Sequence, residues 1–511
     1  MKNELVEKVN DYRDKLRQEM GLPGADVSHF KKPVERPFTK KERRHVTILC
    51  GGLTSIHDIL IKGVFEGLGY RAECLPSPDN KSLSQGKEHC NRGQCNPTYY
   101  TVGNLVKYLK KLRADGVQNI EDKYIYVTAG ACGACRFGMY EAEYRKALTD
   151  AGFEKFRVLT VSQTVETDAA SHENGLILDR KFYTYLIKGL VIGDMINEIK
   201  FKFRPYEVNE GDTEKAVKEI LDLLYNAFSE RKNLFGRLRE AKKILEKLKV
   251  DYSKAKPKVK IIGEFWAQTT EGDGNYGLPK WLEEEGCEVM VEPISGWLDY
   301  TVWWWKAYIK DRIRAGKGVR KKWSFISLLF KISFADFLFK FHHSMYRLAL
   351  GFVNAPLPSQ RQLAQLGHKY YNTRIDGGEG HLEVAKNLMA IKKKKAHLVI
   401  SVKPFGCMPS TQSDGVQARV MNDYKEGLFI PIETSGDGEV NVKSRIQMKL
   451  HEAKVRAKEE YAFFLKEIGV NPDTIKDVAM KKRGLSHAIL KLPSRTTTTA
   501  GNYALYLSKN L

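Results

Sequence analysis

The sequence predicts an α/β fold built of two Rossmann-like parallel-sheet domains that face a cleft, with a helical connector and a helical insert. Two observations predict it. Short apolar runs alternate with helical segments over residues 41–200 and again over 258–470, the pattern of parallel strands joined by crossover helices. In both stretches a strand ends in a turn that contains glycine or proline and carries a cysteine, which indicates two related domains.

The other parts of the chain have different compositions. Residues 1–40 are expected to form a polar helix and a proline-containing linker, and residues 201–257 a helical connector. Residues 301–350 are expected to be a helical insert that interrupts the second domain. Residues 471–511 are basic, and we expect them to be a flexible tail.

The first domain is expected to open with a strand at 45–50, followed by a glycine turn and a helix at 56–67 with Ser55 as its N-cap. Residues 77–98 show no periodic pattern and are expected to be an irregular loop, and a loop of this length usually has a function. The other expected elements of this domain are the strand 71–76, the helix 100–111 and the strands 124–128 and 156–162.

The second domain is expected to repeat this plan on either side of the insert. Its expected elements are a strand that begins at 258 and ends in Gly263 and Glu264, the helix 278–285, the strand 288–293, a helix at 360–371, a helix opened by 376–381, the strands 397–404 and 428–433, and a long helix at 442–466.

Composition narrows the class of protein. The chain has 511 residues, eight cysteines and a formal net charge of +22. The N-terminus is charged, and no apolar stretch reaches the ~20 residues that a membrane-spanning helix needs. We therefore expect a cytoplasmic protein with reduced thiols. The sequence has no zinc-finger, RNA-recognition or helix-turn-helix pattern, so we expect no specific nucleic-acid partner despite the basic charge.

The insert at 301–350 concentrates basic and aromatic residues. It contains eleven Lys or Arg residues against two Asp and no Glu. Trp, Phe and Lys together suit a membrane surface, and the same residues suit a helical pair that docks on another subunit or covers a cleft. We favour docking and keep peripheral membrane contact as the alternative.

Cys132 and Cys135 lie in a glycine-rich turn between an apolar strand and a helix. In an open α/β sheet this turn lies at the carboxyl ends of the strands, where ligands bind. Two thiols separated by two residues have three interpretations: a redox dithiol, half of a zinc site, or part of an iron–sulfur site.

The other cysteines differ in their distance from this edge. Cys407 follows a strand of the second domain, and Cys95 lies in the long loop that crosses the same edge as Cys132. Cys50, Cys74 and Cys90 lie near it, whereas Cys287 begins a strand at the opposite edge and is expected to be structural. Thiols spread over two domains suit a cofactor in the cleft between them better than a compact zinc site.

Several motifs resemble the 2-hydroxyacyl-CoA dehydratase family, which includes subunits of 2-hydroxyglutaryl-CoA dehydratase and benzoyl-CoA reductase. The similarity is greatest to a branch described as related to CoA-substrate-specific enzyme activases, and it runs from about residue 44 to about residue 465. The most specific motifs are Cys-Arg-Phe-Gly-Met-Tyr at 135–140 and Pro-Phe-Gly-Cys-Met-Pro at 404–409; the supporting ones lie at 93–98, 204–207, 258–264 and 292–297.

The resemblance implies an iron–sulfur protein with a [4Fe-4S] cluster, or in one branch a double-cubane cluster. An ATP-dependent activator protein with its own iron–sulfur cluster would supply a low-potential electron, and a 2-hydroxyacyl-CoA would receive it and lose water through a ketyl radical. The chain would pair with a second dehydratase-like subunit or form a homodimer. The implied cluster ligands are Cys95, Cys132, Cys135 and Cys407, with Cys90, Cys50 and Cys74 available to a larger cluster.

Three further residues are candidates for substrate binding. Arg136 would attract an anionic group or pair with Glu141 or Glu143, and Gly378 and Gly380 open a helix that would either receive a CoA phosphate or simply begin with a tight turn. The sequence has no Gly-x-x-x-x-Gly-Lys-Ser/Thr motif, so the chain is not expected to be the ATPase itself.

Two other functions remain open at this point. One is an electron-relay or cluster-scaffold subunit without a substrate of its own. The other is a zinc-stabilised binding protein, which would be colourless and insensitive to air.

Overall fold

The structure is a computed structural model. It describes residues 2–21, 35–130, 135–162, 175–315, 319–375, 378–472, 474–475 and 486–509. The chain divides into two compact units, residues 1–35 and residues 36–511. The first contains helix α1 (Lys2–Glu19), as the sequence predicts, and everything below concerns the second unit.

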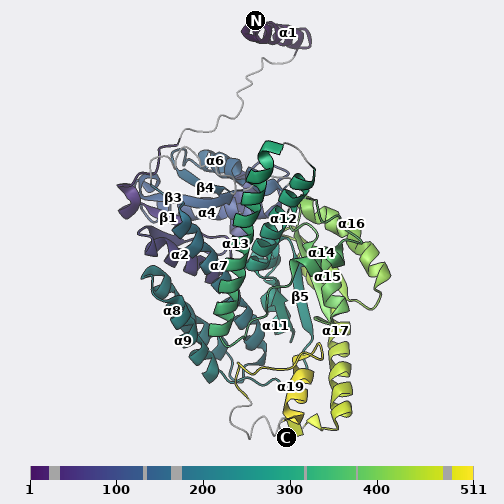
Figure 1. Cartoon of the computed structure of the whole chain (residues 1–511). Helices are drawn as coiled ribbons and strands as arrows, with labels where there is room; N and C mark the ends of the chain where they lie inside the picture. Colours follow the sequence, from purple (N-terminus) through teal and green to yellow (C-terminus); the bar gives the residue numbers. More distant parts are fainter. Residues whose placement is uncertain are drawn as a thin grey trace. The chain divides into compact units, whose positions relative to one another are not determined.

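Two four-stranded sheets organise this unit, and all of their strand pairs are parallel. The strand orders are β2-β1-β3-β4 and β6-β5-β7-β8, so the two sheets have the same topology. The α/β fold class with two parallel-sheet domains is therefore confirmed (Figure 1). The strands are β1 (Thr47–Cys50), β2 (Arg71–Cys74), β3 (Tyr124–Gly130), β4 (Arg157–Ser162), β5 (Lys258–Gly263), β6 (Glu288–Val291), β7 (Leu398–Pro404) and β8 (Phe429–Thr434).

The strand order places a topological switch point in each sheet. β1 connects to β2 on one side, and the chain then crosses to β3 on the other side of β1. β5, β6 and β7 repeat this path. Ligands of open α/β sheets bind outside the carboxyl ends of the strands at such points. The turns that follow β3 and β7 lie at these switch points.

The first sheet is covered on both faces because its strand side chains alternate between two apolar clusters. Leu49 and Tyr126 pack on one face, and Ile48 and Ile125 on the other. The helices and short 3₁₀ turns of this half are η1 (Glu42–Arg44), α2 (Ser55–Gly67), α3 (Asn80–His89), α4 (Asn96–Ala114), α5 (Ile120–Lys123), η2 (Arg136–Met139) and α6 (Tyr140–Asp150).

The expectation of an irregular loop at 77–98 was wrong. Helix α3 occupies its centre and begins with a capping box, in which Asp79 and Ser82 each satisfy a backbone N–H of the other. The prediction of Ser55 as an N-cap was also wrong, because Thr54 takes that position and accepts the N–H of His57. Both predictions overlooked the residue that caps the helix, Thr54 for α2 and Asp79 for α3.

A helical core joins the two halves. Helices α2, α7, α8, α9 and α13 bury their apolar faces against one another, and Ile192, Leu224 and Phe228 lie at the centre with no exposed surface. The elements of the connector are α7 (Arg180–Phe203), η4 (Arg204–Tyr206), α8 (Asp212–Ser229) and α9 (Leu234–Lys247).

The second half carries the greater number of helices. They are α10 (Phe265–Thr269), η5 (Asp273–Asn275), α11 (Leu278–Glu284), α12 (Ile294–Arg314), α13 (Val319–Ala349), α14 (Gln360–Gly367), α15 (Leu382–Lys392), α16 (Met408–Asp423), α17 (Glu439–Ile468) and α19 (Thr499–Ser508). Leu83 and Tyr100, from the first half, pack into the core of this sheet, and the Tyr100 ring lies 5.6 Å from the Trp266 ring.

The expectation of a flexible tail was wrong for residues 486–509. Thr498 caps α19, and Tyr503 and Ala504 of this helix are buried in the helical core. Helix α19 packs beside α17 (Figure 1). The basic composition of the tail concealed a short, largely buried helix, and residues 476–485 lie outside the described residues.

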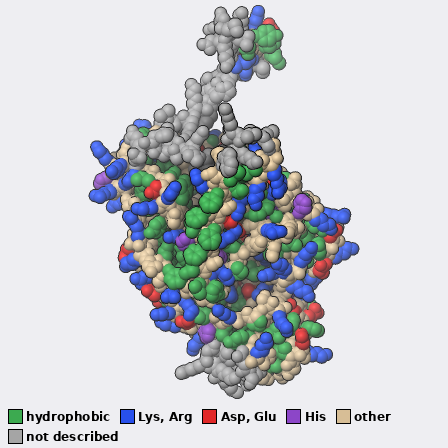
Figure 2. Space-filling view, in the orientation of Figure 1, with side chains coloured by type: hydrophobic (Ala, Val, Ile, Leu, Met, Phe, Trp, Pro, Cys, Tyr) green, Lys and Arg blue, Asp and Glu red, His purple; other side chains and the backbone are tan. Residues whose placement is uncertain are grey.

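The insert forms the helix pair α12 and α13, which pack against each other (Figure 1). Helix α13 exposes phenylalanines along one side, among them Phe330 (73% exposed) and Phe337 (61% exposed). Figure 2, in the same orientation, shows hydrophobic side chains gathered where α13 runs. None of the described helices is both long and apolar enough to pass through a membrane.

Candidate functional site

Three of the predicted cysteine ligands occupy the same local position. Cys95 is the N-cap of α4, Cys135 that of η2, and Cys407 that of α16. Proline follows the cap residue within the first two positions of α4 and α16, where its missing N–H costs nothing. Helix N-termini favour negative charge, and α4 and α16 each present this end to a cysteine. Cys132 lies in the segment 131–134, outside the described residues.

The two halves of the molecule meet at these turns. The backbone N–H of Asn96 donates to the carbonyl of Phe405 at 3.1 Å, and the Asn96 side chain donates to the carbonyl of Thr434 at 2.7 Å. Gly406 has φ +77°, and a side-chain carbon there would lie 3.5 Å from the Cα atom of Cys95. The turn after β7 therefore needs glycine at this position and passes directly beside Cys95.

Polar side chains surround the Cys95 thiol. Its Sγ atom lies 3.2 Å from the Tyr140 hydroxyl and 3.3 Å from the Thr98 hydroxyl. Burial, followed by the neighbouring Cys95, raises the pKa of Tyr140 well above its ordinary value. Tyr140 thus remains protonated and can donate to sulfur. Cys135 accepts the N–H of Phe137 at 3.5 Å.

Two glutamates lie beside the thiols, Glu379 buried and Glu264 half-buried. Glu264 caps α10 by accepting the N–H of Ala267 at 2.8 Å, and Glu379 accepts the N–H of Phe265 at 2.7 Å. Burial raises the pKa of both carboxyls, and the charge of Glu264 helps to raise that of Glu379 to about 8. Two carboxyls this close in a dry site cannot both ionise easily, so the pair retains a proton near neutral pH.

The same environment acts on the sulfurs. Burial, and then Glu264 and Glu379, raise the pKa of Cys135 to about 12 and that of Cys407 further. These thiols stay protonated unless a cation compensates the buried thiolates. Lys403 is the nearby cation: burial lowers its pKa, and the charges of Glu383 and Cys407 oppose that effect.

The three cysteines that were expected to be available to a larger cluster do not gather in one place. Cys90 lies in the same apolar cluster as Cys95. Cys50 and Cys74 are register partners on β1 and β2 and belong to the opposite face of the first sheet. Cys287 is fully buried in the core of the second sheet, and burial raises its pKa to about 12, which is consistent with the structural role expected for it.

The expected substrate-binding residues have other partners in the structure. Arg136 donates to the carbonyl of Gly93 and so ties its turn to the loop before Cys95. Added side chains at Gly378 and Gly380 would overlap Pro409 and Tyr300 respectively, so both glycines lie in a closely packed turn. The tight-turn alternative accounts for this packing without a bound phosphate.

Tyr140, Lys403 and Glu379 were not predicted from the sequence as residues beside the thiols. Tyr140 ends the cysteine motif and Lys403 begins the motif around Cys407, so their place in those motifs was the available signal.

Within the described ranges, no three His, Cys, Asp or Glu side chains form a group that could hold a metal ion. Cys132 lies outside those ranges. The donor set is nevertheless of one chemical kind, since Cys95, Cys135 and Cys407 are all thiols at the N-cap positions of helices. Thiolates are the ligands that iron–sulfur clusters take, so the residues present fit that group.

Comparison with known proteins does not assign the chain to a class. No family model matches the sequence, and no curated protein matches it. The function is therefore argued from the thiol site and from the sequence motifs.

Proposed function

We propose that the chain is an iron–sulfur protein of the 2-hydroxyacyl-CoA dehydratase type, which takes part in low-potential one-electron transfer to an acyl-CoA. The observation that carries the proposal is the meeting of Cys95 and the Cys407 turn, which come from different α/β halves. Desolvation and the neighbouring carboxyls raise the thiol pKa values of Cys135 and Cys407, and metal binding would stabilise their thiolates.

Each side chain has a specific role in this proposal. Cys95, Cys132, Cys135 and Cys407 would hold a [4Fe-4S] cluster, or part of a double-cubane cluster with Cys90 as the nearest further thiol. A bound cluster of this kind supplies electrons one at a time at low potential. The Tyr140 hydroxyl donates to the Cys95 sulfur, and hydrogen bonds to sulfur tune such sites.

The pair Glu264 and Glu379 suits general acid–base catalysis. Both carboxyls lie beside the thiols, and the pair retains a proton near neutral pH. A carboxyl in that state can donate a proton to a leaving hydroxyl and accept it again. This is the type of group that elimination of water requires.

The resemblance to the 2-hydroxyacyl-CoA dehydratases also implies protein partners. An ATP-dependent activator with its own iron–sulfur cluster would supply the electron, and the chain would work with a second dehydratase-like subunit or as a homodimer in the reducing cytoplasm. If the chain were an electron-relay subunit only, it would carry the cluster but show no saturable binding of acyl-CoA.

The decisive experiment is iron and acid-labile sulfide analysis, with an absorption spectrum, on protein purified without oxygen. Cys95→Ala, Cys135→Ala and Cys407→Ala should each lose iron and brown colour. Cys287→Ala is the matched control, because this buried thiol lies in the apolar core of the second sheet and should retain full iron.

The iron content separates the alternatives. About four irons per chain indicate one [4Fe-4S] cluster, and about eight indicate the double-cubane branch. Zinc alone, or no metal after anaerobic reconstitution, contradicts the proposal and leaves a binding protein. Titration with acyl-CoA esters then separates a dehydratase from a relay.

A further inference from the structure

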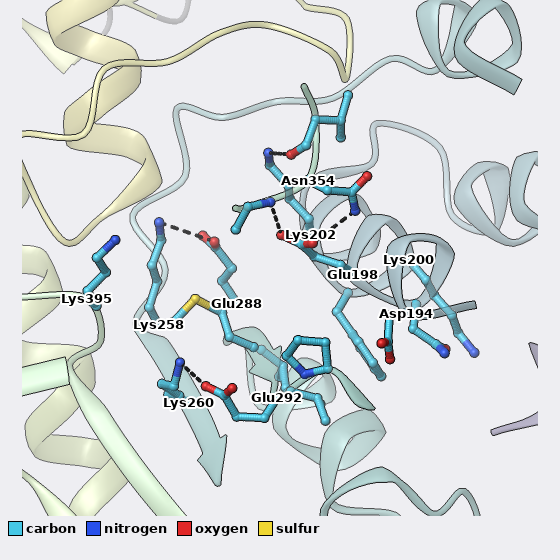
Figure 3. A pocket seen from close by; sticks show the side chains of 18 of the residues that line it. Asp194, Glu198, Lys200, Lys202, Lys258, Lys260, Glu288, Glu292, Asn354 and Lys395 are labelled. Atoms are coloured by element: carbon cyan, nitrogen blue, oxygen red, sulfur yellow. Dashed lines mark hydrogen bonds and ion pairs between the residues drawn. The ribbon is translucent and has the colours of Figure 1, made fainter. Parts of the chain in front are cut away.

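A large cavity lies away from the cysteines. Its volume is about 970 Å³, and it runs along the edge strand β6 between α7, the loop 351–358 and the C-terminal segment 488–499 (Figure 3). None of the described cysteines, nor Glu264, Glu379 or Tyr140, lines it. Small-molecule sites are usually of this size or smaller, so the cavity is large enough for a cofactor-sized ligand.

The lining of this cavity is strongly cationic. Thirteen Lys or Arg residues line it, against five Asp or Glu residues. Figure 3 shows Lys258, Lys260 and Lys395 gathered at one end of the cavity and Asp194 and Lys200 at the other. The charge excess is therefore not spread evenly along the site.

The acidic residues already have partners in the wall. Glu292 pairs with Lys260 and, at 3.0 Å, with Lys386. Glu288 pairs with Lys258 at 3.3 Å and also accepts hydrogen bonds from other groups. These carboxylates neutralise the lysines that they contact, and other carboxylates pair with Lys200, Arg204 and Lys280.

Four cations of the lining, for which no carboxylate partner is found among the described residues, come from two segments. Lys394 and Lys395 follow α15, and Lys491 and Arg495 come from the C-terminal segment. Within the part of the chain that the structure describes, no ion pair with a carboxylate is found for these four residues. The Thr497 hydroxyl donates to the Lys394 carbonyl at 3.0 Å and holds the two segments together.

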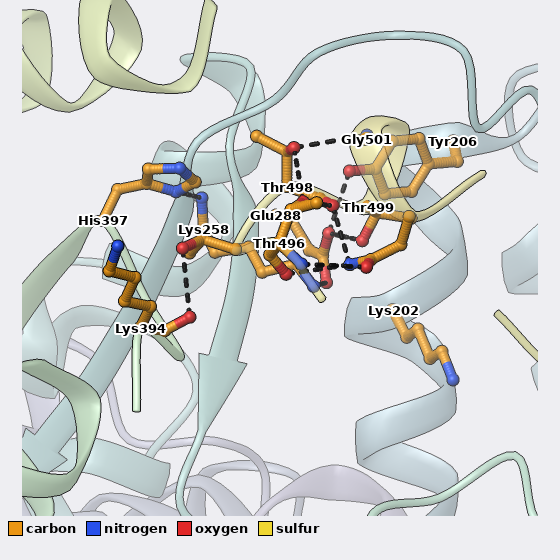
Figure 4. A network of polar contacts seen from close by, with 12 residues as sticks. Lys202, Tyr206, Lys258, Glu288, Lys394, His397, Thr496, Thr498, Thr499 and Gly501 are labelled. Atoms are coloured by element: carbon orange, nitrogen blue, oxygen red, sulfur yellow. Dashed lines mark hydrogen bonds and ion pairs between the residues drawn. The ribbon is translucent and has the colours of Figure 1, made fainter. Parts of the chain in front are cut away.

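A polar network fixes the C-terminal segment at the cavity wall. The Thr499 hydroxyl donates to Glu288 at 2.6 Å, and the Tyr206 hydroxyl donates to the same carboxylate at 2.8 Å (Figure 4). The backbone that carries Arg495 is therefore fixed beside the cavity.

The pKa of Lys395 reflects its burial and the positive charges around it. Burial lowers the pKa of Lys395, and the positive charges of Lys260, Lys393 and Lys258 lower it further. A bound anion would relieve this repulsion. The lining also contains apolar side chains, among them Met290 and Val291 of β6, which suit an uncharged ligand body.

We propose that this cavity binds a small molecule carrying two or more phosphate groups, with the phosphates beside Lys394, Lys395, Lys491 and Arg495 and the uncharged body along β6. Lysine ammonium groups are strong phosphate ligands, and several together favour a polyphosphate over a single carboxylate. The inference goes beyond the proposed function, since it rests on no cysteine and requires no bound metal.

The test is calorimetric titration of the purified full chain with pyrophosphate, ATP and coenzyme A. The double variant Lys394→Gln/Lys395→Gln should weaken binding at least tenfold, because each charge-assisted contact contributes about a factor of ten. Lys449→Gln is the matched control, since this exposed lysine on α17 does not line the cavity. Higher salt should weaken binding to the unsubstituted chain.

The three probes distinguish the source of the phosphates. Pyrophosphate binding as tight as that of the larger probes indicates recognition of phosphate alone, whereas preference for ATP or coenzyme A adds the ligand body. The inference fails if no probe binds more tightly than ~1 mM, or if the control loses as much as the double variant. If the double variant misfolds by circular dichroism, Lys491→Gln/Arg495→Gln replaces it with the same expected loss.

Discussion

Glu460 of α17 should stabilise the C-terminal segment through its charge. Its carboxylate accepts the N–H groups of Thr497 and Thr498 at 2.9 and 2.8 Å and lies 3.4 Å from the His397 ring. Burial alone would raise the pKa of Glu460, but His397 and these two N–H groups outweigh it and lower the pKa to about 2 from 4.5. The carboxylate is held at three points, so its loss should release the segment.

The magnitude follows from the lowered pKa. The difference between 4.5 and about 2 corresponds to ~3 kcal/mol, and because the side chain is 20% exposed we expect ~2 kcal/mol after solvent screening. A group whose pKa is lowered by folding contributes this stability fully above pH 4.5 and loses it as the pH falls towards 2. Glu460→Gln should therefore be most destabilising near neutral pH.

The assay is urea unfolding of the unsubstituted chain and of Glu460→Gln between pH 7 and pH 4. Glu459→Gln, on the exposed side of the same helix, is the control and should change stability by less than ~0.5 kcal/mol. The reasoning would be refuted if Glu460→Gln lowered the free energy of unfolding by less than ~0.5 kcal/mol at pH 7. It would also be refuted if this destabilisation grew as the pH fell. Faster proteolysis near residue 495 in Glu460→Gln would identify the released segment.

Three further substitutions test the packing. Gly103→Ala should destabilise the chain by ~2 kcal/mol in urea unfolding, because the new methyl group would overlap the Ser82 carbonyl where α3 and α4 pack closely. Tyr206→Phe should cost ~1–3 kcal/mol in the same assay, because it removes a buried hydrogen bond to Glu288. Phe330→Ser should change stability by less than ~0.5 kcal/mol, because the ring is 73% exposed, and reduced self-association by sedimentation would support the docking interpretation of the insert.

Much of the candidate site could be predicted from local sequence. Cys95, Cys135 and Cys407 were placed near the carboxyl ends of strands, and all three prove to be helix N-caps. This succeeded because a buried parallel strand is a short apolar run and the turn after it is rich in glycine or proline, both of which are local signals. Local signals also separated Cys287 from the others.

The errors came from segments whose structure depends on distant partners. Residues 486–509 are polar and basic in sequence, yet α19 is buried because α17 and the helical core accept Tyr503 and Ala504. Glu379 is 9% exposed because the turn that carries it packs beside Glu264. Neither partner can be identified from spacing along the chain.

The sequence by itself determined the two parallel sheets and the positions of the thiols along the chain, because hydrophobic periodicity and turn residues act over a few neighbouring positions. Only the tertiary structure decided that Asn96 meets Phe405, that two glutamates lie beside the thiols, and that Lys395 and Arg495 line the same cavity. Contacts between segments hundreds of residues apart depend on how whole elements pack, and side-chain burial and charge crowding exist only once they have packed.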